Sequence, residues 1–176
     1  MRHKPLVLIL GRTGSGKDTL ASRLPLSQLK SYTTRPRRRN ESDTHTFIDE
    51  DFYKSCPDII AETKINGYHY FCTKNQLDEA ELYIIDPIGQ RTLRNNYPDL
   101  PILSIYISAP EHLRRFRAIN SRKDDFQVFE ARNSSEDSQF TQYEQDHDYD
   151  YIIENRNLEA SLLQLNSILK YEGVMS

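Results

Sequence analysis

The sequence has few cysteines and no long apolar run, and both absences exclude classes of protein. Its 176 residues include two cysteines, Cys56 and Cys72, without a Cys-x-x-Cys motif or paired histidines. A disulfide framework and a zinc site are therefore disfavoured, and two reduced thiols are expected. The longest apolar run, Leu6 to Leu10, is far shorter than the roughly 20 residues of a membrane-spanning helix. It is also too short for the core of a signal peptide, so we expect a cytoplasmic protein without a membrane partner.

The chain also lacks a strong excess of one charge. Its net charge is -3 and its pI is near 6.0, which argues against a protein that binds duplex nucleic acid through its phosphates. The charges are nevertheless segregated. Arg35, Arg37, Arg38 and Arg39 stand in one short stretch, whereas residues 124–150 contain nine acidic residues and one arginine. Concentrated arginine without a basic surplus favours a small anionic ligand, although a solvated basic loop is the simpler alternative.

The apolar residues alternate between strand and helix patterns. Leu6 to Leu10 is a continuous apolar run, typical of a strand buried on both faces of a parallel sheet. A glycine-rich turn follows, and residues 17–24 predict a helix that ends before Pro25. Further strands are predicted at 82–85, 102–107 and 151–153, each followed by a helix. This order predicts a single α/β domain built from βαβ units.

Two segments interrupt the alternation. Residues 31–70 mix short β-like pieces with turn residues, and they include a short helix near 51–54 and a hairpin turn at Asn66-Gly67. We interpret this segment as an inserted flap. Residues 119–147 are polar and predict a mobile loop that runs into a helix.

Half of the glycines belong to one short motif. Three of the six stand in Gly11-Arg12-Thr13-Gly14-Ser15-Gly16-Lys17, which matches the Walker A pattern between a predicted strand and a predicted helix. Glycine lets the backbone turn its N–H groups toward a phosphate, the helix N-terminus adds its dipole, and Lys17 adds a positive charge. The alternative is a tight glycine turn with an unrelated lysine. The flanking strand and helix favour a phosphate-binding loop.

The residue after the lysine departs from the Walker A pattern. Asp18 stands where serine or threonine normally places a hydroxyl on Mg²⁺, and Thr19 comes one position later. A carboxylate can also hold Mg²⁺, and acidic residues are favourable in the first turn of any helix. The sequence leaves both roles open for Asp18.

Four further segments carry a family resemblance. They are Ser31-Tyr-Thr-Thr-Arg35-Pro-Arg-Arg38, Asn66-Gly-Tyr-His-Tyr70, Ile84-Ile-Asp86 with Gly89, and Tyr149-Asp-Tyr-Ile-Ile-Glu-Asn155. With the phosphate loop, they make nearly the whole chain resemble the guanylate kinase family of nucleoside monophosphate kinases. The resemblance implies a P-loop kinase core with a parallel five-stranded sheet flanked by helices. The core would comprise residues 1–30, 81–116 and 131–176, with a monophosphate-binding flap at 31–80 and a lid at about 117–130.

The resemblance also implies roles for individual residues. Residues 11–19 and Asn155 would bind ATP with Mg²⁺, and the aspartates Asp18 and Asp86 would be metal ligands. Asp86 has an alternative role as the cap of the next helix. Phosphoryl transfer needs mainly positioning and charge neutralisation. The implied catalytic residues are Lys17, Arg117, Arg122 and Arg132, and those implied to bind the monophosphate are Ser31, Arg35, Arg38, His45, Glu62, Tyr70, Cys72 and Asp86.

Three positions depart from the family pattern around the acceptor. Ala61 stands where family members carry the glutamate that reads guanine, with Glu62 adjacent, and Cys72 replaces a serine. A thiol is a weak hydrogen-bond partner and alanine offers none, so we expect an acceptor base other than guanine, or several bases. His45 replaces a tyrosine on the acceptor phosphate; it would either bind that phosphate or lie on the surface.

The departures leave alternatives to a ribonucleotide kinase. Phage-type deoxynucleoside monophosphate kinases and ribose 1,5-bisphosphate phosphokinases share the Gly-Lys-Asp sequence with this chain. The intact Thr-Thr-Arg-Pro-Arg-Arg element favours a nucleotide acceptor. Guanylate kinase-like domains can also be non-catalytic binding modules, but those lose the glycine-lysine loop. We therefore expect a nucleoside or deoxynucleoside monophosphate kinase, as a monomer or homodimer.

Overall fold

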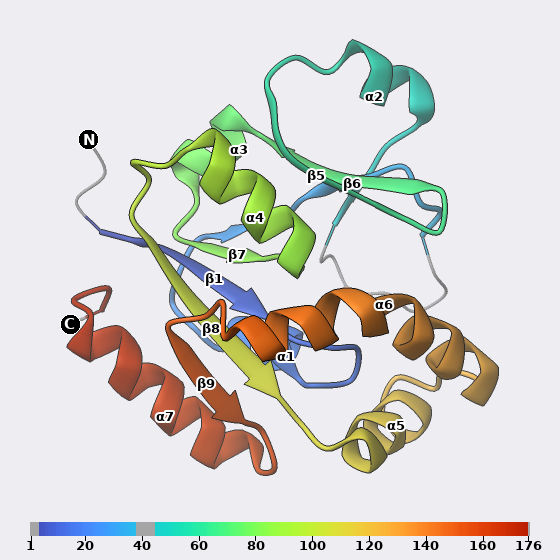
Figure 1. Ribbon diagram of the computed structural model, residues 1–176, viewed down its shortest axis with the longest axis vertical. Helices are drawn as coiled ribbons and strands as arrows, with labels where there is room; N and C mark the ends of the chain where they lie inside the picture. The colour runs from blue at the N-terminus through green and yellow to red at the C-terminus, as the bar shows by residue number, and fades with distance from the viewer. Residues whose placement is uncertain (1–3, 38–44, 176) are drawn as a thin grey trace.

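The computed structural model describes residues 4–37 and 45–175 (Figure 1). Arg38, which the sequence predicts at the acceptor phosphate, lies outside these residues. Over the described ranges the chain forms a five-stranded sheet and a four-stranded sheet, with helices around them. None of the helices in these ranges is long and apolar enough to span a bilayer.

The five-stranded sheet is parallel, with the order β2-β7-β1-β8-β9. β1 (Leu6–Leu10) lies at its centre, between β7 (Leu82–Ile84) and β8 (Ile102–Ser108); β2 is Gln28–Leu29 and β9 is Tyr151–Glu154. All five residues of β1 are buried, as expected for a strand covered on both faces. The predicted parallel five-stranded sheet flanked by helices is confirmed.

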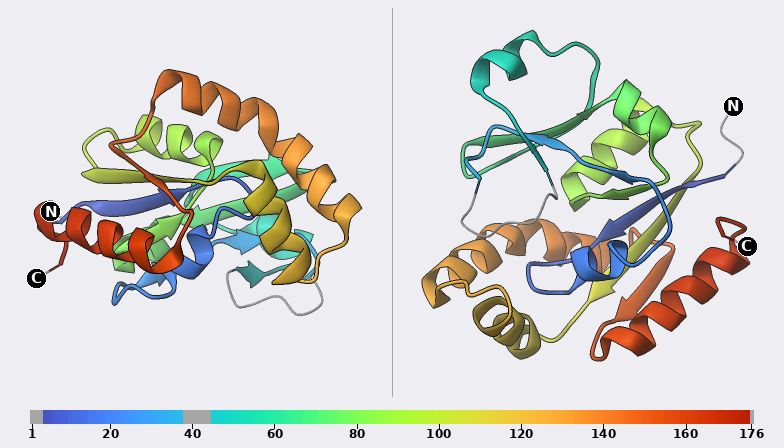
Figure 2. Two further views of the ribbon diagram at one scale, coloured as in Figure 1. Left: turned by 90° about the horizontal axis from the view of Figure 1, so that it is seen from below. Right: turned by 180° about the vertical axis from the view of Figure 1, so that it is seen from behind.

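Helices cover both faces of this sheet, so the core has two halves. On one face lie α4 (Pro87–Asn96) and α6 (Phe126–Asp146), and on the other lie α1 (Lys17–Ala21) and α7 (Leu158–Tyr171) (Figure 2). Alternate side chains of β1 enter the two halves. The first half includes Leu6, Leu8, Leu10, Leu93 and Phe140, and the second includes Val7, Ile9, Leu20, Leu165 and Leu169.

The segment predicted as a flap contains the four-stranded sheet. Its order is β4-β3-β6-β5, with β3 Tyr32–Thr33, β4 Thr46–Phe47, β5 Ile59–Ile65 and β6 Tyr68–Thr73. α2 (Glu50–Ser55) lies between β4 and β5 in the chain, and α3 (Lys74–Glu79) leads back to the core. Asn66 and Gly67 have φ of 50° and 84°, which are the left-handed values of a tight hairpin turn. The predicted hairpin is confirmed.

Two helices follow β8 and pass over the phosphate loop. α5 comprises Glu111–Asn120, residues 121–125 connect it to α6, and α6 continues without a break to Asp146 (Figure 1). The expected boundary between lid and core, at residue 130, therefore falls inside one helix. The lid segment is continuous with a helix whose later residues Phe140 and Tyr143 are buried in the core.

One predicted helix is shorter in the structure, and one strand was not predicted. The helix predicted at 17–24 ends at Ala21, because the N–H groups of Arg23 and Leu24 bond to carbonyl oxygens three residues back and tighten the last turn. β2 was not predicted, because a strand of two residues has no visible alternation. Its place at the sheet edge depends on pairing with β7.

Candidate active site

The phosphate loop joins the carboxyl end of β1 to the start of α1. Gly14 and Gly16 have φ of 77° and 89°, a conformation that favours glycine. A Cβ atom at Gly16 would lie 2.4 Å from Asn155 Nδ2, and one at Gly11 would lie 2.5 Å from the carbonyl oxygen of Ile107. The loop therefore needs these glycines both for its conformation and for space.

Asn155 and Arg117 hold the loop through its carbonyl groups. Asn155 Nδ2 donates to the carbonyl oxygen of Ser15 at 2.8 Å, and Arg117 Nη1 donates to the same oxygen at 3.2 Å. Arg117 Nη2 donates to the carbonyl oxygen of Asn155 at 2.7 Å, and Asn155 is buried. The sequence predicted Asn155 at ATP and Arg117 as catalytic. The structure places both against the loop backbone, where they fix its conformation.

Lys17 and Asp18 form the first turn of α1. Lys17 Nζ lies 3.5 Å from Asp18 Oδ2, and both side chains are partly exposed. Burial raises the pKa of Asp18, but Lys17 and His45 lower it by more, so this pKa lies below its ordinary value. Thr19 is exposed on the same turn. An ionised carboxylate beside the phosphate loop fits Mg²⁺, which prefers oxygen ligands and shares them with substrate phosphates.

Four predicted acceptor-site residues meet on the flap. Ser31 Oγ lies 2.8 Å from His45 Nδ1, and Arg35 Nε donates to the Tyr70 hydroxyl at 2.9 Å. The rings of His45 and Tyr70 are 5.6 Å apart, edge to face. Arg35 is 8% exposed, and its guanidinium lies 5.3 Å from the centre of the Phe47 ring. We call Ser31, Arg35, His45 and Tyr70 the flap cluster; it combines a buried cation with hydroxyl and imidazole groups.

Asp86 lies where β7 leads into α4. Its Oδ1 accepts from the N–H of Gly89 at 2.7 Å and from the Thr63 hydroxyl at 3.0 Å. Asp86 is thus the N-cap of α4, the alternative that the sequence left open. Burial raises its pKa above the ordinary value, although the two hydrogen bonds lower it in part. The Thr63 bond also joins the flap to the core.

Ala61 and Cys72, at two of the departures from the family pattern, lie in the core. They pair across β5 and β6, and their exposed fractions are 2% and 0%. Burial raises the pKa of the Cys72 thiol to about 11, although a hydrogen bond with Tyr83 lowers it in part. The thiol is therefore neutral at pH 7 and packs among apolar side chains. The structure does not bring Cys72, a predicted acceptor-site residue, to an exposed surface.

Glu62 points to the outer side of the flap. Tyr53 of α2 donates its hydroxyl hydrogen to Glu62 Oε1 at 2.8 Å, and His69 Nδ1 contacts the same oxygen. The rings of Tyr53 and His69 stack with centres 3.9 Å apart. Neighbouring residues of a strand face opposite sides, so Glu62 lies away from Thr63 and its partner Asp86. The structure thus does not bring Glu62 to the acceptor side, where the sequence predicted it.

The other two predicted catalytic arginines, Arg122 and Arg132, share one carboxylate. Arg122 Nη2 lies 2.8 Å from Asp124 Oδ2, and Arg132 Nη1 lies 3.1 Å from the same oxygen. Arg122 Nη2 also donates to the Thr13 hydroxyl at 3.2 Å. Burial lowers the pKa of Arg132, and Asp124 raises it in part. Arg122 thus lies next to the phosphate loop, and the single negative charge of Asp124 offsets part of the positive charge of the two arginines.

Arg12 is in the phosphate loop but its side chain extends to α6. Its Nε donates to Glu144 Oε1 at 3.0 Å, and its Nη2 donates to Glu144 Oε2 at 3.1 Å. Nη1 donates to Asp137 at 2.9 Å. Tyr106 of β8 donates a short hydrogen bond to Glu144 as well. Arg12, predicted at ATP, thus joins the loop to the later half of α6 in this structure.

Sequence reasoning missed residues of α5 and α6 that contact the loop, among them Arg114, Glu136 and Glu144. Arg114 of α5 is buried, and its Nη1 donates to the carbonyl oxygen of Thr13 at 3.2 Å. Glu136 of α6 accepts from the N–H of Thr13, and Glu144 holds Arg12. The acidic excess of residues 124–150 was the available signal for the two glutamates. It did not identify which acidic residues face the loop.

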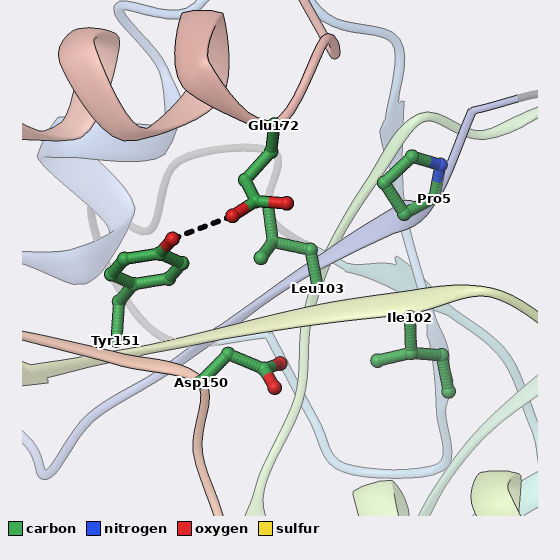
Figure 3. Close-up of a pocket in the computed structure, with 6 residues that line it drawn as sticks. All are labelled: Pro5, Ile102, Leu103, Asp150, Tyr151 and Glu172. Carbon is green, nitrogen blue, oxygen red and sulfur yellow. Dashed lines mark hydrogen bonds between the residues drawn. The ribbon is translucent and has the colours of Figure 1, made fainter.

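A cavity of about 420 Å³ lies at the opposite end of the sheet (Figure 3). It is at the amino ends of β8 and β9, whereas the phosphate loop follows the carboxyl end of β1. The hydroxyl of Tyr151 donates to Glu172 there, and Asp150 accepts from the Ser104 hydroxyl at 2.7 Å. Its carboxylates are thus used within the fold, and the cavity is remote from the predicted site.

The chain is similar in sequence to curated guanylate kinases. It is 29% identical over 187 residues to the guanylate kinase of Anaplasma phagocytophilum, and the alignment covers 95% of this chain and 87% of that relative. It is 28% identical over 194 residues to the guanylate kinase of Nitrobacter winogradskyi, and the alignment covers 98% of this chain and 85% of that relative. No protein-family profile matches the chain.

The fold is similar to a solved guanylate kinase. The TM-score to the crystal structure of the Anaplasma phagocytophilum enzyme is 0.68 at 21% sequence identity, over 100% of this chain and 90% of that chain. At this identity the structural similarity shows the fold alone, and the sequence similarity extends over the same length. Sequence and fold together support a guanylate kinase-like P-loop kinase, and the guanylate kinase homologues indicate an ATP-dependent nucleoside monophosphate kinase.

Proposed function

We propose that the phosphate loop holds ATP and that the flap cluster holds the phosphate of a nucleoside or deoxynucleoside monophosphate. The observation that carries this proposal is the meeting of Ser31, His45, Arg35 and Tyr70 on the flap. The two sites are electrostatically coupled, because His45 lowers the pKa of Asp18 and Arg35 lowers that of Arg132. An acceptor phosphate at the flap cluster would thus approach the donor phosphates at the loop.

Each charged group has a separate task in this proposal. Lys17 neutralises charge on the transferred phosphoryl group, and Arg122 and Arg132 stabilise its non-bridging oxygens once they leave Asp124. Arg35 holds the acceptor phosphate with its forked donors, which Arg38 would complement. Mg²⁺, held by Asp18 and the ATP phosphates, would supply further charge neutralisation.

Closure of the site would exclude water from the transfer. The flap, residues 31–80, and the lid, about 117–130, would move over the core when both substrates are bound. The flap would move relative to the core at contacts such as the hydrogen bond between Thr63 and Asp86. The core would then comprise residues 1–30, 81–116 and 131–176.

The acceptor base is the least constrained part of the proposal. The relatives are named guanylate kinases, which makes GMP the reference acceptor. In this chain Ala61 and Cys72 are buried, and Glu62 bonds to Tyr53 on the outer side of the flap. A site with few fixed donors and acceptors discriminates weakly between bases. We therefore propose that GMP is not preferred by more than about tenfold, or about 1.4 kcal/mol, over the best other monophosphate.

A coupled assay of ADP release tests the acceptor directly. The panel contains ribo- and deoxynucleoside monophosphates together with ribose 1,5-bisphosphate, each at saturating ATP and Mg²⁺. We expect turnover with several monophosphates and little with ribose 1,5-bisphosphate. A preference for GMP or dGMP of about a hundredfold or more would overturn the weak base discrimination. Turnover with ribose 1,5-bisphosphate alone would overturn the nucleotide acceptor.

A further inference from the structure

One backbone donor of the phosphate loop is bonded to a carboxylate of the chain itself. The N–H of Thr13 donates to Glu136 Oε2 at 2.7 Å, the distance of a charge-assisted hydrogen bond. Thr13 is 4% exposed, and its carbonyl oxygen and hydroxyl accept from Arg114 and Arg122. Backbone N–H groups of a loop of this kind are donors for phosphate oxygens. Glu136 thus accepts from an N–H group that would otherwise be suited to a phosphate oxygen of the nucleotide.

Two of the predicted catalytic arginines are bonded to a second carboxylate. Arg122 and Arg132 both lie within hydrogen-bond distance of Asp124 Oδ2, and the Asp124 side chain is only 17% exposed. Asp124 directly precedes Asp125, the N-cap of α6, and Glu136 lies within the same helix. One helix and the residue before its cap therefore supply both carboxylates.

The carboxylates and a bound nucleotide would compete. Asp124 and Glu136 both raise the pKa of Arg132, so the two negative charges lie around the same cation. Donor phosphates at Thr13 and at the arginines would bring further negative charge to this place. Like charges that share a partly buried site repel, and each N–H can donate fully to one acceptor only.

We propose that Asp124 and Glu136 are internal substitutes for the donor phosphates, which must displace them when ATP binds. The proposal rests on the proposed function in one respect, that the loop binds the phosphates of a nucleotide donor. The substitutes keep the N–H and the arginines satisfied without nucleotide, and donor binding then requires both carboxylates to move away from these groups. Their cost is a weaker affinity for ATP than the loop alone would give.

Arg12 limits how much of the chain this displacement involves. Its guanidinium bonds to Asp137 and Glu144, so α6 is attached to the loop from the residue after Glu136 onward. Displacement of Glu136 therefore needs a rotation of its side chain, and displacement of Asp124 needs a movement of the connection before α6, while α6 stays on the core.

Equilibrium titration of ATP and of adenosine into Glu136→Gln, Glu136→Ala and Asp124→Asn tests the proposal. We expect ATP to bind about tenfold tighter to Glu136→Ala and about threefold tighter to Glu136→Gln and Asp124→Asn, because a competing charge-assisted bond is lost or weakened. Adenosine has no phosphate, so its affinity should not change. Glu159→Gln, which removes an exposed carboxylate from α7, is the matched control and should leave both affinities unchanged.

Thermal unfolding of each variant checks that it is folded. If Glu136→Ala does not fold, Glu136→Gln takes its place in the test, because its side chain keeps an oxygen acceptor for the N–H of Thr13. ATP affinity that is unchanged or weaker in the folded variants would overturn the proposal, as would an equal gain for adenosine. No ATP binding to the wild type or to any variant would overturn both this proposal and the proposed function. Tighter ATP binding by the variants without phosphoryl transfer to any monophosphate would support this proposal and overturn the proposed function.

Discussion

The phosphate loop and the flap cluster are built in different ways. The loop is a short contiguous segment between β1 and α1, and its glycines adopt the conformations that its wrapping requires. The flap cluster is assembled from residues next to β3 and β4 and from β6, and these strands meet through pairing. The conformation of the loop therefore follows from its own glycines, with support from Asn155 and Arg117, whereas the flap cluster depends on contacts across its sheet. Substitutions in the two regions should therefore affect different substrates.

The largest effect is expected in the loop. Lys17→Ala should lower kcat by on the order of 10²-fold or more. In the proposed function Lys17 neutralises negative charge on the transferred phosphoryl group, and alanine removes that positive charge. Steady-state kinetics with ATP and the best monophosphate measures this loss. Circular dichroism of the same preparation controls for folding. Activity within a few-fold of the wild type would show that the loop is not the donor site.

A smaller effect, confined to one substrate, is expected in the flap cluster. Arg35→Lys should raise KM for the monophosphate by about tenfold and leave KM for ATP within about twofold, because lysine lacks the forked donors that hold a phosphate. Initial rates over a grid of both substrates separate the two constants. Equal increases in both would assign Arg35 to the donor site and abolish the distinction between the regions.

Helix caps extend the comparison to stability. Asp86→Ala should lower the free energy of unfolding by about 1 to 2 kcal/mol, because α4 loses its N-cap and Thr63 loses its partner. Asp49→Ala removes the exposed cap of α2 in the flap, where the loss should be about 0.5 to 1 kcal/mol. Urea unfolding of both variants measures the difference. A larger loss of unfolding free energy in Asp49→Ala than in Asp86→Ala would contradict this order and show that the cap of α2 stabilises the protein more than the cap of α4.

The smallest kinetic effect is expected at Glu62. Because its carboxylate bonds to Tyr53 on the outer side of the flap, Glu62→Gln should change the ratio of kcat/KM for GMP to that for the best other monophosphate by less than about twofold. Tyr53→Phe, which removes the partner hydroxyl, is the matched control. A change of tenfold or more in Glu62→Gln alone would show that Glu62 reads the base after the flap closes.

The sequence predicted those parts of the molecule that neighbouring residues determine. The apolar run of β1, the glycines of the loop and the Asn66-Gly67 turn each have a local cause, and the structure confirms all three elements. The flap cluster could be predicted only through a family resemblance, because Ser31 and Tyr70 are brought together by strand pairing.

Other features depended on side-chain direction, which the sequence does not specify. Adjacent residues of β5 face opposite sides, so a one-residue difference in alignment decides whether Glu62 or Thr63 meets Asp86. Similarly, the polar pattern of α6 does not show which of its acidic residues face the loop. Glu136 and Glu144 do so because of how α6 packs on the core.

The most direct test of the account is the fate of the γ-phosphoryl group of labelled ATP. The reaction contains Mg²⁺ and either one monophosphate or ribose 1,5-bisphosphate, with wild-type protein or Lys17→Ala. The account predicts label in the nucleoside diphosphate with the wild type, and a rate lower by on the order of 10²-fold with Lys17→Ala. Label found only in inorganic phosphate or only in the product of ribose 1,5-bisphosphate would contradict it, as would equal transfer by both proteins.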